Sequence, residues 1–167
     1  RGRLTAFYKT ELPLLLHEAR FELLLGLSIF LIAVLIGVIS CYADNDFLGV
    51  VVGSEYVEMT RANIEKGDPM AVYKDDSFFG SFLGITANNI WVSFVTFIFG
   101  ITYIGTIGIM VKNGVMLGAF QYFFADYGLF QESFLTVWMH GALEISAIVI
   151  SGAAGLTLGK GLLFPGT

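Results

Sequence analysis

The sequence LLLGLSIFLIAVLIGVISCYA, at residues 23–43, contains 21 residues without a charged side chain. A helix of about 20 apolar residues is long enough to cross the hydrocarbon core of a bilayer, so this stretch predicts a membrane-spanning helix. It is too long for the apolar part of a cleaved signal peptide, and an amphipathic stretch precedes it. We therefore expect residues 23–43 to be the first pass of an integral membrane protein.

Two further apolar runs follow. Residues 90–111 contain 22 residues without a charge, and residues 133–159 are interrupted only by Glu144 and are otherwise free of charged side chains. The whole chain has the same character, because 56% of its 167 residues are hydrophobic and only 14% are charged. Soluble domains carry about 25% charged residues. These runs predict two further passes.

The segment between these two runs, residues 113–130, contains a shorter apolar stretch. Residues 115–125 would form only about 16 Å of helix at 1.5 Å per residue, and extension to Phe130 adds Gln121 and Asp126. Two interpretations stay open: a third full pass, or a re-entrant half-helix, which is tolerated where its backbone is buried in protein. The expected fold is an all-α, polytopic transmembrane bundle with about four membrane segments, residues 78–167 forming its larger part.

Residues 1–22 form an amphipathic segment. Pro13 falls in the first turn of a helix that Thr10 could cap, where a missing N–H is harmless. One face of that helix is apolar and another is acidic. The apolar face contains Leu12, Leu15, Leu16, Ala19 and Leu23, and the acidic face contains Glu11, Glu18 and Glu22. The segment either lies at the headgroup boundary or extends the first pass into the cytoplasm.

The main hydrophilic segment is residues 44–77, which contain eight acidic residues against three basic ones. Within it, Ser54 to Lys66 has a helical pattern, followed by Gly67 as a C-cap and Pro69 just beyond. A single short helix cannot bury its own apolar face, so we expect it to pack on the bundle or on a partner. Lys and Arg near helix ends favour the cytoplasmic side; the basic residues of the first segment, with Lys112 and Lys160, predict a cytoplasmic N-terminus and an external acidic loop.

Several function classes are excluded by composition. A single cysteine, Cys41, allows neither an internal disulfide nor a Cys-rich zinc site, and a net charge of −5 without a basic block speaks against nucleic acid as a partner. No phosphate-binding loop or nucleophilic triad order is present. Because the chain begins at Arg1 rather than Met, we expect a fragment of a longer protein.

Polar residues inside the apolar runs are the candidate functional residues. His140 and Glu144 are one helical turn apart and so point the same way, and an ionisable residue at mid-membrane is a functional hypothesis by default. Ser151 continues their stripe with Ala147 and Gly155, and Trp138, Ile145 and Val149 on the opposite side are expected to face lipid. The neighbouring apolar runs supply further polar side chains at Asn88, Asn89 and Asn113.

Three interpretations of the His140/Glu144 pair remain. The pair can be structural, hydrogen-bonded within the bundle. It can instead handle protons or cations in a transport path, or provide two ligands of a divalent metal such as zinc, although a catalytic metal normally has three protein ligands. Small-residue pairs at Gly114/Gly118 and Gly155/Gly159 are typical of helices in close contact.

Six segments carry a family resemblance: TELP (10–13), NIEKGDPMAVY (63–73), FLGITANNI (82–90), NGVMLGAFQYFF (113–124), HGALEISAIVISGAAG (140–155) and GLLFPGT (161–167). With them the chain resembles the stage II sporulation protein M family, in the versions found in Bacteroidota-type bacteria. The HGxxE element followed by a small-residue helix is the most family-specific of the six.

The resemblance implies a bacterial inner-membrane protein that acts as a scaffold or organiser of cell-envelope remodelling. Because no catalytic motif is present, we expect neither catalytic residues nor a cofactor. The implied partners are the bilayer, other envelope membrane proteins including cell-wall hydrolases, and a second copy of the chain. A transporter or pore component that uses His140 and Glu144 is the alternative, and a membrane metallohydrolase a further one.

Overall fold

The computed structural model describes residues 2–69 and 78–165, except for the side chains of residues 2–3, 78–83, 85 and 136–140. All regular structure in these residues is helical, which confirms the all-α prediction. In chain order the elements are α1 (Gly2–Ala6), the π-helical turn η1 (Phe7–Glu11), α2 (Leu12–Glu18), α3 (Arg20–Ala43), the π-helical turn η2 (Gly49–Gly53), α4 (Ser54–Glu65), α5 (Phe78–Ile98), the 3₁₀ turn η4 (Phe99–Thr102), α6 (Ile104–Asp126) and α7 (Phe130–Leu163).

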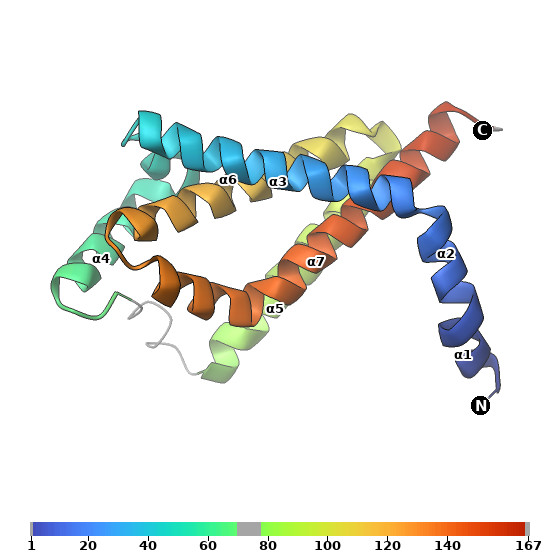
Figure 1. Ribbon diagram of the computed structural model, residues 1–167, viewed down its shortest axis with the longest axis horizontal. Helices are drawn as coiled ribbons and strands as arrows, with labels where there is room; N and C mark the ends of the chain where they lie inside the picture. The colour runs from blue at the N-terminus through green and yellow to red at the C-terminus, as the bar shows by residue number, and fades with distance from the viewer. Residues whose placement is uncertain (1, 70–77, 166–167) are drawn as a thin grey trace.

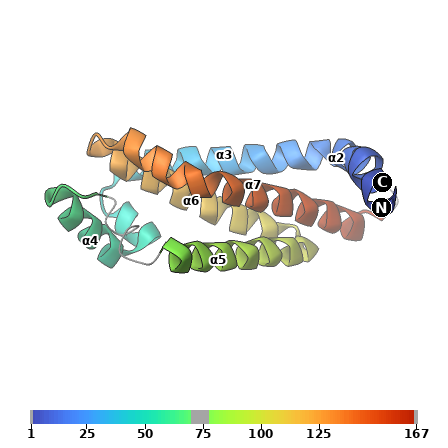
Figure 2. The same cartoon turned by 90° about the horizontal axis from the view of Figure 1, so that it is seen from below.

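The four long helices form one elongated bundle (Figures 1 and 2). α3 and α6 run in the same direction, since Gly26 lies beside Met110 and Gly37, further along, lies beside Ala119. α7 runs against them, because its last turn returns to the beginning of α3. α5 runs with α7. The chain therefore reverses direction at every connection, and both termini lie at the end of the bundle opposite α4.

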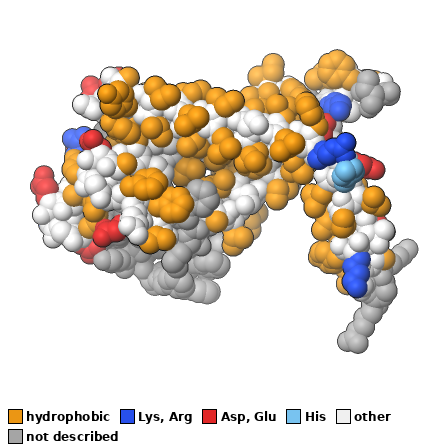
Figure 3. Space-filling model, in the orientation of Figure 1, with side chains coloured by type: hydrophobic (Ala, Val, Ile, Leu, Met, Phe, Trp, Pro, Cys, Tyr) orange, Lys and Arg blue, Asp and Glu red, His pale blue; other side chains and the backbone are white. Residues whose placement is uncertain are grey.

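Three helices of the described residues are long and apolar enough to cross a membrane: Arg20–Ala43, Ile104–Asp126 and Gly141–Leu163. Thr86–Thr102 is a shorter apolar helix. Large hydrophobic side chains cover the outside of the bundle (Figure 3), among them Leu31 and Leu35 of α3, which are more than half exposed. An apolar outer surface of this kind is what lipid covers in a helical membrane protein, as residues 23–43 predicted.

Glycines set the contact between α3 and α6. A Cβ atom added at Gly118 would lie 2.0 Å from the carbonyl oxygen of Val34, and one at Gly37 would lie 2.2 Å from the carbonyl oxygen of Val115. The two backbones therefore touch, which only a residue without a side chain permits. The predicted small-residue pair Gly114/Gly118 is confirmed as a helix contact, since Gly114 faces Ala33 in the same way.

The second predicted pair, Gly155/Gly159, is also a contact. Cβ atoms added at these two positions would lie 3.0 Å from the carbonyl oxygen of Thr96 and 2.4 Å from that of Gly100, respectively. Across the same contact, the Thr106 hydroxyl donates a 2.7 Å hydrogen bond to the carbonyl oxygen of Thr96. The glycines of α7 thus pack closely against backbone and side-chain atoms of the turn between α5 and α6.

The structure differs from the prediction at the second and third apolar segments. The break lies at η4 and Tyr103, which has φ 57°, and not near Lys112. The expected helix 90–111 is therefore split, and α6 begins at Ile104, nine residues before the predicted start at residue 113. Lys112 is an exposed residue in the middle of α6 and does not flank a loop. The 23 residues of α6 form one continuous helix.

The hydrophilic segment forms the helix that the sequence predicted. α4 ends at Glu65, with Lys66 as its C-cap and Gly67 at φ 81°, a value that favours glycine. It packs on the bundle: Val57 is buried in an apolar cluster together with Cys41 of α3 and Phe124 of α6. Part of this segment, residues 70–77, lies outside the described residues.

The N-terminal segment is helical from Gly2, so Thr10 does not begin a helix. Pro13 does lie in the first turn of α2, as predicted. Ala19, with φ −84° and ψ 8°, separates α2 from α3. α2 consequently leaves the axis of α3 at a steep angle (Figure 1).

Candidate functional site

The predicted polar residues lie on three neighbouring helices: Asn88 and Asn89 on α5, Asn113 on α6, and His140, Glu144 and Ser151 on α7. Register brings two of them to one level. α5 and α6 are antiparallel around the Thr96–Thr106 hydrogen bond. Asn89 lies seven residues before Thr96 and Asn113 seven residues after Thr106, so these two side chains are level. α6 and α7 are antiparallel around Met110 and Gly152, and Glu144, eight residues before Gly152, is therefore level with Gly118. Glu144 thus lies more than one helical turn further towards the α4 end than Asn113.

All three of these side chains are half-buried, whereas Asn88 is exposed. The Asn113 Nδ2 donates a 2.8 Å hydrogen bond to the carbonyl oxygen of Ile109, one turn back on its own helix. This bond leaves the side-chain oxygen of Asn113 as an acceptor at the same level. The side chain of His140 lies outside the described residues, so the predicted His140/Glu144 pair does as well.

The lipid-facing side predicted for α7 is partly wrong. Val149 is 8% exposed and belongs to a core cluster with Phe30 and Met110. Ser151 and Ala147 are half-buried, and Leu143 and Ile150 are instead exposed. α7 has two packed sides, because its small residues approach the α5–α6 turn while Val149 faces α3. The exposed side lies between these two.

A metal centre gains no support from the described residues. Among them, no group of three or more His, Cys, Asp or Glu side chains could hold a metal ion. Glu144 is the part of the predicted ligand pair that the structure describes, and it is half-buried.

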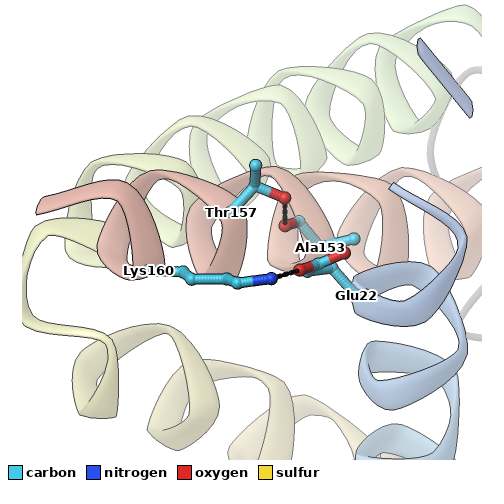
Figure 4. Close-up of polar contacts among 4 residues, drawn as sticks. All are labelled: Glu22, Ala153, Thr157 and Lys160. Atoms are coloured by element: carbon cyan, nitrogen blue, oxygen red, sulfur yellow. Dashed lines mark hydrogen bonds and ion pairs between the residues drawn. The ribbon is translucent and has the colours of Figure 1, made fainter. Parts of the chain in front are cut away.

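The sequence analysis missed an ion pair at the end of the bundle that carries both termini. Lys160 Nζ lies 3.0 Å from Glu22 Oε1, and the Glu22 side chain is 9% exposed while that of Lys160 is 50% exposed. Glu22 occupies the first turn of α3 and Lys160 the last turn of α7, so each charge also complements the dipole of its helix. Figure 4 shows the pair, with Thr157 bonded to the carbonyl of Ala153 beside it. These residues are 138 positions apart, and no local pattern could have paired them.

Two buried polar atoms of the described residues have no hydrogen-bond partner: Ser93 Oγ on α5 and Gln121 Nε2 on α6. The Gln121 side-chain oxygen is 3.5 Å from the hydroxyl of Ser133, which is fully buried and donates more closely to the carbonyl of Phe130. Buried polar atoms without partners are uncommon in folded proteins.

Comparison with known protein families gave a match. The family model described as Stage II sporulation protein M matches residues 26–167, which is most of the chain. Neither the search of curated proteins nor the search of solved structures returned a match.

Proposed function

Because the chain belongs to the stage II sporulation protein M family, we propose that it is a non-catalytic scaffold that organises cell-envelope remodelling in the bacterial inner membrane. The supporting observation is the acidic face that α4 presents at one end of the bundle. Glu55, Glu58 and Glu65 are exposed on α4, whereas Val57 and Thr60 are buried against the bundle. α4 is therefore held in place on one side and free to contact an envelope partner, such as a cell-wall hydrolase, on the other.

The orientation that this role requires puts α4 outside the cytoplasm. The basic residues Arg3, Lys9, Arg20 and Lys160 lie at the opposite end of the bundle, and such residues favour the cytoplasmic side. In a Cys41→Ala background, which removes the buried native thiol, we expect a membrane-impermeant reagent to label Ser54→Cys in intact cells. Thr5→Cys should be labelled only after lysis; labelling of position 5 alone in intact cells would reverse the orientation.

Loss of the α4 face should abolish scaffold function without unfolding the protein. In a strain that lacks the protein, Glu55→Gln/Glu58→Gln is expected to fail to restore the normal envelope, because two exposed charges of the docking face are gone. The matched control is Asp126→Asn/Glu132→Gln, which removes two exposed charges at the same end of the bundle from α6 and α7 rather than from α4, and it should restore the envelope. Equal rescue by both double variants contradicts a docking role for α4.

The alternative function is transport of protons or cations, favoured by the half-buried polar side chains of Asn89, Asn113 and Glu144. Glu144→Gln in the same rescue strain separates the two functions. A scaffold should tolerate this change, since glutamine keeps the size and hydrogen-bonding capacity of the side chain. A transporter should fold normally and fail, because the titratable proton is gone.

A zinc metallohydrolase is the third candidate, with His140 and Glu144 as ligands. The chemistry of these two side chains suits zinc. Elemental analysis of the purified protein beside its Glu144→Gln variant tests this candidate: a near-stoichiometric metal that the variant loses would support it over the scaffold.

A further inference from the structure

The N-terminal helical segment, residues 2–18, points away from the bundle. α1, η1 and α2 follow one another without interruption, and the chain then bends at Ala19 into α3 (Figure 1). In the view turned by 90°, the same segment is seen nearly end-on while α3 lies along the picture (Figure 2). The segment therefore runs across the bundle axis and does not continue α3. At 1.5 Å per residue, it is about 25 Å long.

The bend is held on both sides. Arg20 Nη1 hydrogen-bonds to His17 Nε2 across Ala19, which joins α2 to the first turn of α3. In the same first turn of α3, Glu22 is paired with Lys160 of α7. The segment thus leaves the bundle from an anchored point.

Its apolar side chains are uncovered. Leu15 is 54% exposed and Tyr8 64% exposed, and they belong to a larger set of exposed hydrophobic residues in this segment: Leu4, Phe7, Tyr8, Leu14, Leu15 and Leu16. Seventeen residues with this many exposed large apolar groups would be poorly solvated in water. Their burial needs an apolar medium close to the end of the bundle.

The charges of this region indicate what kind of apolar medium buries these side chains. Residues 1–20 contain four basic residues, Arg1, Arg3, Lys9 and Arg20, against two acidic ones, Glu11 and Glu18. Lys160 lies at the same place but is paired with Glu22, so these two residues add no net charge. Figure 3 shows basic side chains where the segment meets the bundle. A positive region beside an apolar face is complementary to anionic lipid headgroups over acyl chains.

We propose that residues 2–18 form an in-plane helix that binds the surface of an anionic bilayer. A bundle that spans a membrane has its axis along the membrane normal, so a helix that runs across that axis lies along the membrane surface. The bend at Ala19 brings it to the level of the headgroups at the end of α3. The exposed apolar side chains on the side of Leu15 and Leu16 then insert between acyl chains, and Lys9 and Arg20 reach phosphate groups by snorkelling.

The test uses spin labels on the whole protein in lipid nanodiscs that contain phosphatidylglycerol, in the Cys41→Ala background. Labels are placed at Leu16→Cys and Glu18→Cys, since residues two positions apart point to nearly opposite sides of a helix. We expect the label at position 16 to collide mainly with oxygen, which concentrates in lipid. The label at position 18 should collide mainly with a water-soluble nickel complex.

Charge dependence completes the test. Replacing Lys9 by glutamine should lower the ratio of docked to undocked helix about fivefold in anionic nanodiscs, which corresponds to about 1 kcal/mol per basic residue. Lys66→Gln, at the other end of the bundle, should leave the ratio unchanged. Equal nickel accessibility at positions 16 and 18 would show a helix in water and overturn the proposal. A label at position 16 that is shielded from both reagents would show a protein partner or second copy and overturn it as well.

Discussion

Gly118→Ala is expected to prevent or strongly weaken the packing of α3 on α6. The added methyl group would lie 2.0 Å from the carbonyl oxygen of Val34, a backbone atom that cannot rotate away. The two helices must then separate over the contact that also includes Gly37 and Gly114. Overpacking of a close contact costs about 1–3 kcal/mol and occasionally more, and we expect the upper end here because backbone meets backbone. Thermal melting of the purified protein in detergent measures the effect.

Gly108→Ala is the matched control on the same helix. No atom lies within 4 Å of a Cβ added at Gly108, and alanine favours a helix over glycine by about 1 kcal/mol. This variant should melt at the wild-type temperature or above it. If the two alanine variants melt together, α3 and α6 are not in backbone contact.

Lys160→Met should give the second largest loss of stability. It leaves the carboxylate of Glu22 buried at the start of α3 without its 3.0 Å partner. An unpaired buried acceptor costs about 1–3 kcal/mol, and more if it is charged, while the half-exposed position of Lys160 moderates the value. The same detergent melting experiment measures it, and α7 should detach first at this end.

The double variant Glu22→Leu/Lys160→Met distinguishes the cost of leaving Glu22 unpaired from the net contribution of the ion pair. Because it removes both charges, it should recover much of the stability that Lys160→Met loses. Lys66→Met, an exposed lysine at the other end of the bundle, controls for the loss of a surface charge. Equal melting of Lys160→Met and Lys66→Met would mean that the ion pair contributes nothing.

Much of the fold could be predicted because hydropathy and helix caps are local signals. Residues 23–43 became α3, and Gly67 followed the short helix α4 as expected. The turn at Tyr103 was missed because residues 90–111 contain no charge and no proline that would mark an interruption. It is held instead by tertiary contact, since Gly159 packs against the Tyr103 ring.

The candidate site was predictable only in part. Polar residues in apolar runs can be recognised in the sequence, and two of them, Asn89 and Asn113, lie at one level of the bundle. Which side of a helix is buried depends on its neighbours, however, and α7 has neighbours on two sides. Val149 was therefore assigned to lipid although it lies in the core. The Glu22–Lys160 pair depends on the register of distant segments, which one sequence does not contain.

The buried thiol of Cys41 can report on the separation of α3 from α6 in the unaltered protein. It is 2% exposed, beside Ala119 and Phe123 where α3 meets α6. An alkylating reagent can reach it only when these helices part, so the alkylation rate of the unaltered protein follows the population of the opened state when reclosing is fast. The transient opening of the bundle in a native membrane can therefore be measured, without detergent or added label sites, as the rate at which a single sulfur atom is modified.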